Sequence, residues 1–315
     1  MILTLTPNPS LDRTIEVDAL VRGEVHRARS SRVDPGGKGV NVSRALVKHR
    51  TSTVAVLPAG GAEGAQLAAL LAPIGVPVID IPLASPTRSN VTLVEPDGTT
   101  TKINEPGPVL SPAEITAMTE RVTTFAGSAD WVVLSGSLPR GVPSPFYAEL
   151  VERIHALGGR VVVDTSGEPL ADAVAAGPDL VKPNAEELVE VAGGPLLTWG
   201  DVADAARRLR SLGVGSVLVS LGGDGALLVD DDGTRRAFTA AVDVRSTVGA
   251  GDATLAGFLV AGARGDTALQ TAVAFGAAAV SLPGSAMPAP SDVQIDLVTV
   301  ENDPDLSTPL KGDTR

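Results

Sequence analysis

Cysteine is absent from the 315 residues, and histidine and aromatic residues are scarce. Without thiols the chain has no disulfide framework, no thiolate metal site and no cysteine nucleophile. His26, His49 and His155 stand far apart in the sequence, which disfavours a zinc centre and a serine–histidine triad. Aromatic residues form only 3% of the chain, so we expect an aliphatic core and few platforms on which bases can stack.

Positive charge and long apolar runs are limited as well. The chain has 25 Lys+Arg against 37 Asp+Glu, a formal charge of −12, which repels nucleic-acid backbones. The most apolar stretch, residues 253–282, is interrupted by Arg264, Asp266 and Gln270, and the first residues lack the pattern of a signal peptide. We therefore expect a soluble, cytoplasmic protein with no nucleic-acid partner and no membrane partner.

The pattern of apolar residues predicts an α/β fold. Hydrophobic residues make up 43% of the chain, and short apolar runs alternate with longer helical patterns. This alternation is typical of βαβ units, in which helices cover both faces of a mainly parallel central sheet. Ligands of such sheets bind beyond the carboxyl ends of the strands. Strands are expected near 2–5, 53–57, 131–134, 160–163, 216–219 and 226–229, and helices near 40–48, 64–71, 111–125, 144–156, 201–212 and 251–263.

Residues 14–33 and 88–104 break this alternation, because they contain short strand-like pieces with no helix between them. Asp97-Gly98 is a hairpin signal between two such pieces. These segments predict a small antiparallel sheet that serves as a lid, a dimer surface or both, or else an ordinary edge hairpin. Residues 301–315 are polar with two prolines and predict a frayed tail, which leaves residues 1–300 as a single domain.

The most informative segment is Gly249-Ala250-Gly251-Asp252, which leads into an apolar helix. Small residues leave their N–H groups accessible at a helix N-terminus, where an anion binds well. A carboxylate beside such an anion hole can take a hydroxyl proton while the hole stabilises a transferring phosphoryl group. The alternative is that the glycines only end a strand and that Asp252 caps the helix.

Three further segments carry groups suited to a phosphorylated ligand. Gly36-Gly37-Lys38-Gly39 precedes a helix that contains Asn41, and it is not a Walker A loop, because glycine follows the lysine. Asn184 and Glu187 offer oxygen ligands to Mg²⁺, although the same pair is a plain capping box. The stretch 220–225 is either a turn or a glycine-lined wall for a nucleotide, and no stretch matches a dinucleotide fingerprint.

The order of these motifs carries a resemblance to a known family. Asn8-Pro9-Ser10-Leu11-Asp12 follows the first strand, and the glycine–lysine loop, Asn184–Glu187, the 220–225 stretch and the 249–252 segment come after it in turn. The chain resembles the ribokinase/PfkB family of sugar kinases over essentially its whole ordered length. Within that family it is most similar to the phosphosugar branch and to bacterial 1-phosphofructokinases.

The resemblance implies a role for each motif. ATP with Mg²⁺ would phosphorylate a sugar hydroxyl, with Asp252 as the base and the amides of Gly249, Ala250 and Gly251 as the anion hole. The family's nucleotide and metal residues would be those of the second half of the chain, and its sugar-binding residues those near the start. The nucleotide site would take Asn184, Ser220, Gly222, Gly223 and Gly225, the metal Asn184, Glu187 and Asp164, and the sugar Asp12, Gly37 and Asn41.

A phosphorylated acceptor needs local cations in a chain of net charge −12. Arg27, Lys38, Arg88 and Lys102 are available, and the branch places a segment like Ser135-Gly136 beside the substrate. The reaction implied is phosphorylation of fructose 1-phosphate at its C6 hydroxyl. Tagatose 6-phosphate and fructose 6-phosphate are alternative acceptors, and a non-catalytic phosphosugar sensor is a remote alternative. The resemblance also permits a homodimer that pairs through the lid.

Overall fold

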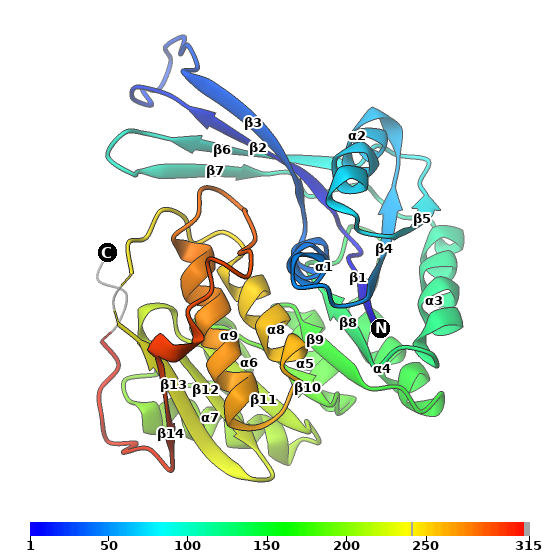
Figure 1. The fold of residues 1–315 in the computed structure, drawn as a ribbon. Helices are drawn as coiled ribbons and strands as arrows, with labels where there is room; N and C mark the ends of the chain where they lie inside the picture. The colour runs from blue at the N-terminus through cyan, green and yellow to red at the C-terminus, as the bar shows by residue number, and fades with distance from the viewer. Residues whose placement is uncertain (241, 312–315) are drawn as a thin grey trace.

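A ten-stranded, mostly parallel sheet forms the centre of the protein, which a computed structural model describes over residues 1–240 and 242–311 (Figure 1). Seven neighbouring strands, from β11 to β5, run parallel, and the three strands at the other edge are antiparallel. The strand order is β14 (Val298–Asn302), β13 (Gly233–Thr239), β12 (Ala226–Asp230), β11 (Ser216–Ser220), β10 (Leu180–Val181), β9 (Val161–Asp164), β8 (Trp131–Ser135), β1 (Ile2–Leu5), β4 (Thr53–Ala59) and β5 (Val78–Pro82).

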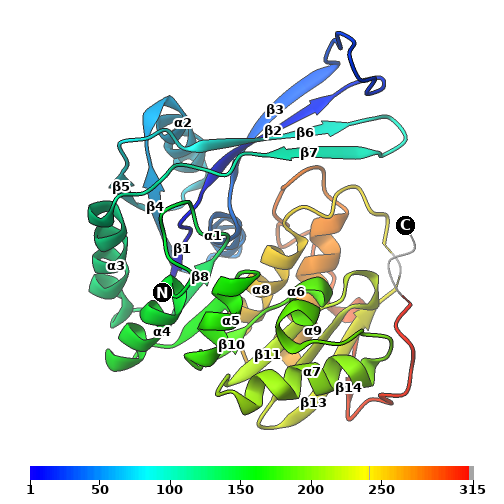
Figure 2. The same cartoon turned by 180° about the vertical axis from the view of Figure 1, so that it is seen from behind.

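Helices cover both faces of this sheet, so the predicted α/β class is confirmed (Figures 1 and 2). One face packs against α3 (Pro112–Ala126), α4 (Phe146–Ala156), α5 (Glu168–Ala175), α6 (Ala185–Ala192) and α7 (Trp199–Ser211). The other packs against α1 (Lys38–Lys48), α8 (Ala250–Val260) and α9 (Gly265–Val280), and α2 (Gly61–Leu71) lies beside α1. Three short 3₁₀ turns, η1 (Ala72–Ile74), η2 (Gly222–Asp224) and η3 (Ile295–Leu297), join elements in the described residues.

The two cores follow from the period of two along each strand. In β9 the side chains of Val161 and Val163 enter the core beneath α3–α7, whereas Val162 enters the core beneath α1, α8 and α9. Successive strand residues point to opposite faces, so a strand buried on both sides must be apolar throughout. Polar residues of these strands are therefore expected at the strand ends, and Asp164 is the last residue of β9.

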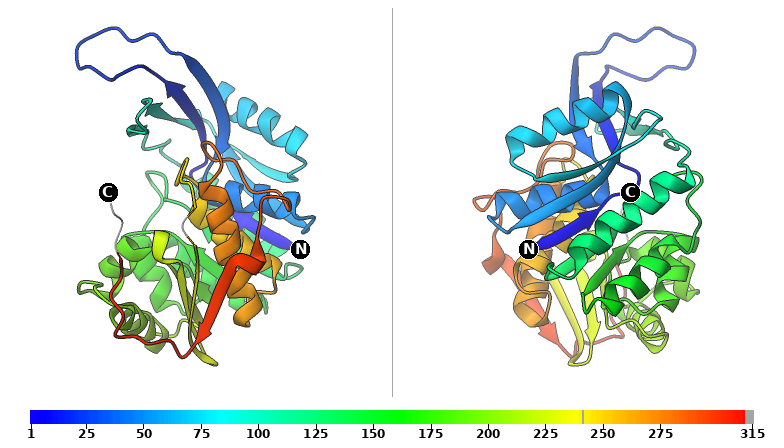
Figure 3. Two further views of the ribbon diagram at one scale, coloured as in Figure 1. Left: turned by 60° about the vertical axis from the view of Figure 1, so that its left-hand side comes forward. Right: turned by 90° about the vertical axis from the view of Figure 1, so that its right-hand side faces the viewer.

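A second sheet projects from this body, and Figure 3 shows it extending beyond the helices. It consists of β3 (Ser30–Gly36), β2 (Ser10–Glu16), β6 (Arg88–Val94) and β7 (Thr100–Asn104), in that order. The pairs β2–β3 and β6–β7 are antiparallel hairpins, and β2–β6 is a parallel pairing that joins them. These strands lie in the two segments that the sequence analysis separated from the βαβ units.

The end of the chain is more ordered than expected. Residues 301 and 302 complete β14, and the following segment returns to the start of α7, where the Gly200 amide donates to the Leu306 carbonyl at 2.8 Å. Leu306 and Leu310 also pack on the core beneath α3–α7. The prediction of a frayed tail is therefore wrong for residues 301–311, because Leu306 and Leu310 bury apolar surface against the core. Residues 312–315 lie outside the described residues. No helix of the described chain is long and apolar enough to cross a membrane.

Candidate active site

Asp252 lies at the point where α8 begins. Gly249 precedes the helix with φ of +80°, a left-handed conformation that glycine adopts without strain, and the chain then turns into the helix at Ala250. The first N–H groups of a helix have no partners within it. Gly249, Ala250 and Gly251 are partly exposed, whereas Asp252 is only 7% exposed. The three residues of the predicted anion hole therefore lie next to the Asp252 carboxylate, and the Ala250 amide lies 3.4 Å from the Thr247 carbonyl.

The surroundings of Asp252 suit a base that works near neutral pH. Burial and the charge of Asp164 raise the pKa of Asp252 to about 6, against the opposing effects of Lys38, Asn41 and Lys182. The side-chain amide of Asn41 donates to Asp252 Oδ2 at 2.8 Å. A base whose pKa lies slightly below the working pH is mostly ionised and still accepts a proton readily.

Two lysines share one buried carboxylate beside Asp252. Lys38 Nζ lies 2.7 Å from Asp164 Oδ1, and Lys182 Nζ lies 3.2 Å from Asp164 Oδ2. Burial raises the pKa of Asp164, but the two ammonium groups outweigh it and hold that pKa below its usual value. Burial likewise opposes the charge of Lys38, yet Asp164 and Glu187 raise its pKa. The cluster therefore keeps two positive charges at the site.

Asn184 and Glu187 form the capping box that the sequence analysis left open. The Glu187 amide donates to Asn184 Oδ1 at 2.8 Å, and the Asn184 amide donates to Glu187 Oε2 at 2.9 Å. The other oxygen of Glu187, Oε1, lies 3.1 Å from Lys38 Nζ. Within the described residues no three His, Cys, Asp or Glu side chains form a metal-ligand cluster. Asp164 and Glu187 therefore both pair with Lys38, and they do not line a preformed metal site.

The glycines at 222–225 form the turn between β11 and β12. Gly225 has φ of +98°, and a Cβ there would lie 2.1 Å from the Ala237 carbonyl oxygen, so only glycine fits. Around Gly223, by contrast, a Cβ would meet nothing within 4 Å. Ser220, the last residue of β11, forms a parallel bridge with Asn184. The turn therefore lies beside the capping box, with an open surface at Gly223.

Asp12 lies on the second sheet, next to the glycine–lysine loop. It accepts hydrogen bonds from Ser10 Oγ at 2.7 Å and from Asn90 Nδ2 at 2.9 Å. A Cβ on Gly36 would lie 2.3 Å from Asp12 Oδ2, so glycine is required for this close approach. Gly37 adopts φ of +117° just before α1 and turns the chain into the helix that carries Lys38 and Asn41.

The predicted phosphate-binding cations are only partly brought together. Arg88 donates to the Asn8 carbonyl at 3.2 Å and to the Glu105 carbonyl at 3.0 Å. Burial lowers the pKa of its guanidinium, and the charge of Asp12 opposes this effect. Lys102 faces Thr92 across β6–β7, four residues along β6 from Arg88, or about 13 Å at the usual rise per residue. Arg27 is exposed in the loop between β2 and β3. Lys38 lies in the carboxylate cluster instead of on the second sheet.

Ser135 and Gly136 lie deeper than expected, at the end of β8. Ser135 is fully buried, and its hydroxyl lies close to the position that a Cβ on Gly39 would take. The Gly136 carbonyl accepts hydrogen bonds from Tyr147 at 2.8 Å and from Thr165 at 2.9 Å. Ser135 is therefore enclosed beside Gly39 of α1, whereas a Cβ on Gly136 would meet nothing within 4 Å, so open space adjoins Gly136.

Three residues at the site were not predicted from the sequence. Lys182 is one of only five lysines in the chain, and its Nζ lies 3.3 Å from the position that a Cβ on Gly251 would take, beside the predicted anion hole. Its position after β10, beside Asn184, was an available signal. Asn90 gave no signal, because its partner Asp12 is 78 residues away along the chain, and Arg44 gave none, because a single arginine three residues after Asn41 belongs to no motif.

Comparison with known proteins decides the family. Residues 6–292 match the model of the pfkB family carbohydrate kinases. The chain belongs to this family. It is 40% identical over 295 residues to the 1-phosphofructokinase of Rhodobacter capsulatus, covering 92% of this chain and 93% of that protein. It is 37% identical over 300 residues to the ATP-dependent 6-phosphofructokinase isozyme 2 of Mycobacterium tuberculosis, covering 93% and 88%.

A solved pfkB-type structure has the same fold. The phosphofructokinase-2 of Escherichia coli, in complex with substrates and products, superposes with a TM-score of 0.88 at 35% identity, covering 92% of this chain and 96% of that one. The resemblance drawn from the sequence motifs is therefore confirmed. The protein is an ATP-dependent sugar-phosphate kinase of the pfkB family.

Proposed function

We propose that this pfkB kinase transfers the γ-phosphoryl group of ATP to the C6 hydroxyl of fructose 1-phosphate, which yields fructose 1,6-bisphosphate and ADP. The observation that carries the proposal is Asp252, a buried carboxylate of raised pKa at the N-terminus of α8, next to two lysines. The 1-phosphofructokinase from Rhodobacter capsulatus, at 40% identity, supports this acceptor.

Asp252 acts as the general base. Its Oδ1 takes the proton of the C6 hydroxyl, because Oδ2 already accepts the Asn41 amide proton. The sugar oxygen bonds to the γ-phosphorus as the bond to the β–γ bridging oxygen breaks, and ADP leaves with that electron pair. The amides of Gly249, Ala250 and Gly251 face the charge that spreads over the equatorial phosphoryl oxygens. Positioning and charge stabilisation of this kind supply most of the acceleration in phosphoryl transfer.

The nucleotide is proposed to lie along the turn at 222–225. Gly222, Gly223 and Gly225 provide a wall without side chains, and the space at Gly223 is open. Ser220 and Asn184 lie at the phosphate end of this wall, where their bridge joins β11 to α6. Glu187, in the first turn of α6, lies 3.1 Å from Lys38 Nζ, so this end of the wall adjoins the lysine cluster.

Mg²⁺ is proposed to arrive with the nucleotide. Magnesium usually keeps several waters and binds through one or two carboxylates and substrate phosphates. Glu187 and Asp164, with Asn184 beside them, fit such a partial ligand set, through retained waters, and do not fit a closed cage, because Lys38 is already paired with both carboxylates. When bound, the ion would supply charge neutralisation at the phosphates.

The acceptor is proposed to bind between the glycine–lysine loop and the second sheet, which then acts as a lid over a single kinase domain. Asp12 and Asn41 would hold sugar hydroxyls, with Gly37 allowing close approach. The strand register places Asp12, Asn90, Arg88 and Lys102 on one face of the sheet, together with Arg32. Arg32 adjoins Gly284, so this face looks toward the body. Arg88 is the cation best placed to meet the acceptor's phosphate.

Fructose 6-phosphate is the second candidate acceptor. The 6-phosphofructokinase isozyme 2 of Mycobacterium tuberculosis is 37% identical to this chain, close to the 40% of the 1-phosphofructokinase. The chemistry at Asp252 would be unchanged, because only the end of the sugar that carries the phosphate differs. Tagatose 6-phosphate would be accommodated in the same way.

We also propose a homodimer that pairs through the lid. The face of the second sheet opposite Asp12 carries apolar side chains at alternate positions, including Ile15, Val91, Leu93 and Ile103. Ile103 is 58% exposed. Light scattering on the purified protein tests the pairing, with a mass of twice 31.9 kDa expected and a monomeric mass contradicting it.

The proposed acceptor is tested by ADP release with magnesium–ATP and four sugars. These are fructose 1-phosphate, fructose 6-phosphate, tagatose 6-phosphate and unphosphorylated fructose. We expect kcat/KM to be highest for fructose 1-phosphate, by at least about tenfold, which corresponds to 1.4 kcal/mol of discrimination. A preference for a 6-phosphate would overturn the acceptor and keep the mechanism. Binding of a phosphosugar by folded protein without turnover would indicate a sensor.

A further inference from the structure

Arg44 is a buried cation next to the base that the proposed reaction does not use. It lies on α1, one turn after Asn41, and is only 7% exposed. Burial lowers the pKa of its guanidinium, and within the described residues no carboxylate lies within ion-pair distance of it. Burying a charge without such a partner is costly unless hydrogen bonds compensate for the lost water. The charges of Asp34, Asp12 and Asp252 favour the ionised guanidinium from a distance, and its direct polar contacts are hydrogen bonds.

The guanidinium of Arg44 donates to three oxygens from three parts of the chain. Its Nη1 lies 2.8 Å from Asn41 Oδ1, 3.2 Å from the Pro35 carbonyl and 3.5 Å from Ser285 Oγ. Pro35 belongs to the glycine–lysine loop, and Ser285 follows α9. The bond to Asn41 is the shortest, and all three acceptors lie around the same nitrogen.

These contacts decide which way the Asn41 amide points. A guanidinium has only donors, so the side of the amide that faces Arg44 must be its oxygen. The NH₂ group then faces Asp252, where it donates to Oδ2 at 2.8 Å. If the amide were reversed, its NH₂ would meet the donors of Arg44, and its oxygen would meet the carboxylate of Asp252. Arg44 thus excludes the reversed amide.

The orientation of Asn41 in turn distinguishes the two oxygens of Asp252. Oδ2 accepts the amide proton and cannot itself carry a proton without losing that bond. Oδ1 is the oxygen left to accept a proton. We propose that Arg44 is a positioning residue for phosphoryl transfer: through Asn41 it fixes the carboxylate of Asp252 so that Oδ1 faces the acceptor hydroxyl. This inference rests on the proposed role of Asp252 as the base.

The segment after α9 gives the arrangement a second anchor. Ser285 is 3% exposed, and two residues later Met287 packs so close to Gly249 that a Cβ there would lie 2.7 Å from its Cε. The same short segment thus contacts Arg44 and the N-terminus of α8. The guanidinium and the anion hole are therefore held at a fixed separation by one piece of chain.

The test uses a double-mutant cycle between Arg44 and Asn41. Arg44→Met keeps the length of the side chain and removes its donors, and Asn41→Ala removes the group through which Arg44 is proposed to act. We expect Arg44→Met to lower kcat on the order of 10–100-fold, as a small misplacement of a reacting group does, with KM for ATP within a few-fold. The double variant should be no slower than Asn41→Ala alone, because the two residues act as one unit.

The pH profile supplies a readout that a purely structural role would not move. In Arg44→Met the amide of Asn41 is no longer held in place, so the bond to Oδ2 that favours the ionised carboxylate of Asp252 is weakened. The acidic limb of kcat/KM should therefore shift to higher pH, while the charges of Asp164, Lys38 and Lys182 stay in place. Arg44→Lys keeps the positive charge, which itself acts on Asp252, but loses the planar guanidinium, so an acidic limb that still shifts in this variant, with only part of the activity recovered, separates the positioning of Asn41 from the loss of charge.

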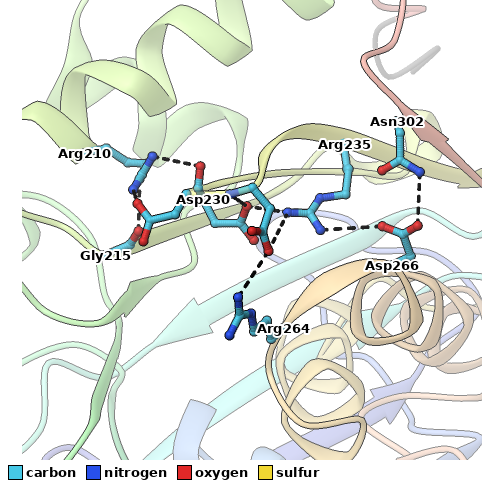
Figure 4. Close-up of polar contacts among 9 residues, drawn as sticks. Arg210, Gly215, Asp230, Arg235, Arg264, Asp266 and Asn302 are labelled. Atoms are coloured by element: carbon cyan, nitrogen blue, oxygen red, sulfur yellow. Dashed lines mark hydrogen bonds and ion pairs between the residues drawn. The ribbon is translucent and has the colours of Figure 1, made fainter.

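Arg210 offers a matched control elsewhere in the fold. It donates to the carbonyls of Gly215 at 2.9 Å and Asp230 at 2.8 Å and pairs with Asp231, and none of these partners is bonded to Asp252 or Asn41 (Figure 4). Arg210→Met should lower the melting temperature and leave kcat and the pH profile unchanged. Asp252→Asn is the reference for the mechanism itself.

The outcomes distinguish a failure of the role proposed for Arg44 from a failure of the role proposed for Asp252. The role of Arg44 would be overturned if the losses of kcat in the two single variants multiplied in the double variant. It would also be overturned if the kcat and the acidic limb of Arg44→Met matched those of the wild type. If Asp252→Asn were itself active, the proposed base would fail first. If Arg44→Met does not fold, the cycle is run with Arg44→Lys, for which the same non-additivity with Asn41→Ala is expected and its absence is equally decisive.

Discussion

The ammonium group of Lys38 lies 2.7 Å from the carboxylate of Asp164, and this pair joins the glycine–lysine loop to the end of β9. Asp164 is fully enclosed and also pairs with Lys182, so one carboxylate balances two lysines next to the base. These ion pairs therefore connect the glycine–lysine loop, near the start of the chain, to strands from its middle. Several predictions for solution experiments rest on this cluster and its surroundings.

Loss of Asp164 should destabilise the fold more than loss of either lysine. In Asp164→Ala the buried ammonium group of Lys182 loses its carboxylate partner, and Lys38 keeps only Glu187. Removing one partner of a buried pair costs about 3–5 kcal/mol, and we expect urea unfolding to show a loss of this size. Asp172→Ala, on the α5 helix, is the control and should change the unfolding free energy by less than about 0.5 kcal/mol. Equal losses of unfolding free energy in Asp164→Ala and Asp172→Ala would contradict the stabilising role of the cluster.

The rate should depend on pH through Asp252. Because burial and Asp164 raise its pKa to about 6, kcat/KM should fall about tenfold per pH unit below that value and level off above it. The measurement is the initial rate between pH 5 and 8 at low acceptor concentration, with corrections for the coupling enzymes. A rate that stays constant down to about pH 5 would mean that no group of this pKa acts as the base.

The same pKa has an opposite consequence for stability. A carboxyl group whose pKa is raised on folding binds its proton more tightly in the folded state, so its contribution to stability falls as pH rises from about 4 to about 6. Asp252→Asn, which cannot ionise, should therefore melt at a higher temperature than the wild type at pH 8, with a smaller difference near pH 4. A variant that melts lower than the wild type at pH 8 would argue against the buried, ionised carboxylate.

The anion hole predicts a strong effect of one methyl group at Gly249. Gly249→Ala would strain the left-handed backbone at φ of +80° and press on Met287, so the amides at the start of α8 would shift. We expect kcat to fall on the order of 10²-fold, as for loss of one oxyanion-hole donor. Gly127→Ala is the matched control, because its φ is −66° and a Cβ there meets nothing within 4 Å. Comparable kcat values for the two variants would rule out the proposed hole.

Arg88 should act on the acceptor and not on the nucleotide. Replacing it with glutamine removes a charge-assisted contact worth about 1.5–3 kcal/mol, so KM for the phosphosugar should rise about 10–100-fold while KM for ATP stays within a few-fold. Arg13→Gln is the control, since Arg13 lies on β2 but points to the opposite face of the second sheet. A rise in KM for ATP alone would indicate that Arg88 contacts the nucleotide and not the acceptor.

The fold was largely predictable because its signals are local. Short, nearly continuous apolar runs with helical patterns between them mark the central sheet, and the interruption of this alternation marks the second sheet. The structure places Asp252, Asn41 and Glu187 around one cluster, in line with the order of the motifs. The wrongly predicted tail shows the limit, because the packing of Leu306 depends on a helix about a hundred residues earlier.

The contacts between distant residues could not be predicted from local patterns. Lys38 was expected to bind the acceptor's phosphate, but its partners Asp164 and Glu187 are 126 and 149 residues away along the chain. Arg44 carries no motif, and its importance appears only when Asn41 and Asp252 are seen together. Spacing in the sequence reports on one helix or strand, whereas charge pairing depends on which strand ends meet at the sheet edge.

The proposed mechanism depends most directly on the carboxylate of Asp252. The decisive measurement compares kcat of Asp252→Asn with that of the wild type, using the acceptor that the wild type prefers, with nucleotide and sugar binding measured on the same samples. We predict that kcat falls on the order of 10²–10⁴-fold while both dissociation constants stay within a few-fold. Turnover by Asp252→Asn within a few-fold of the wild type would contradict the account.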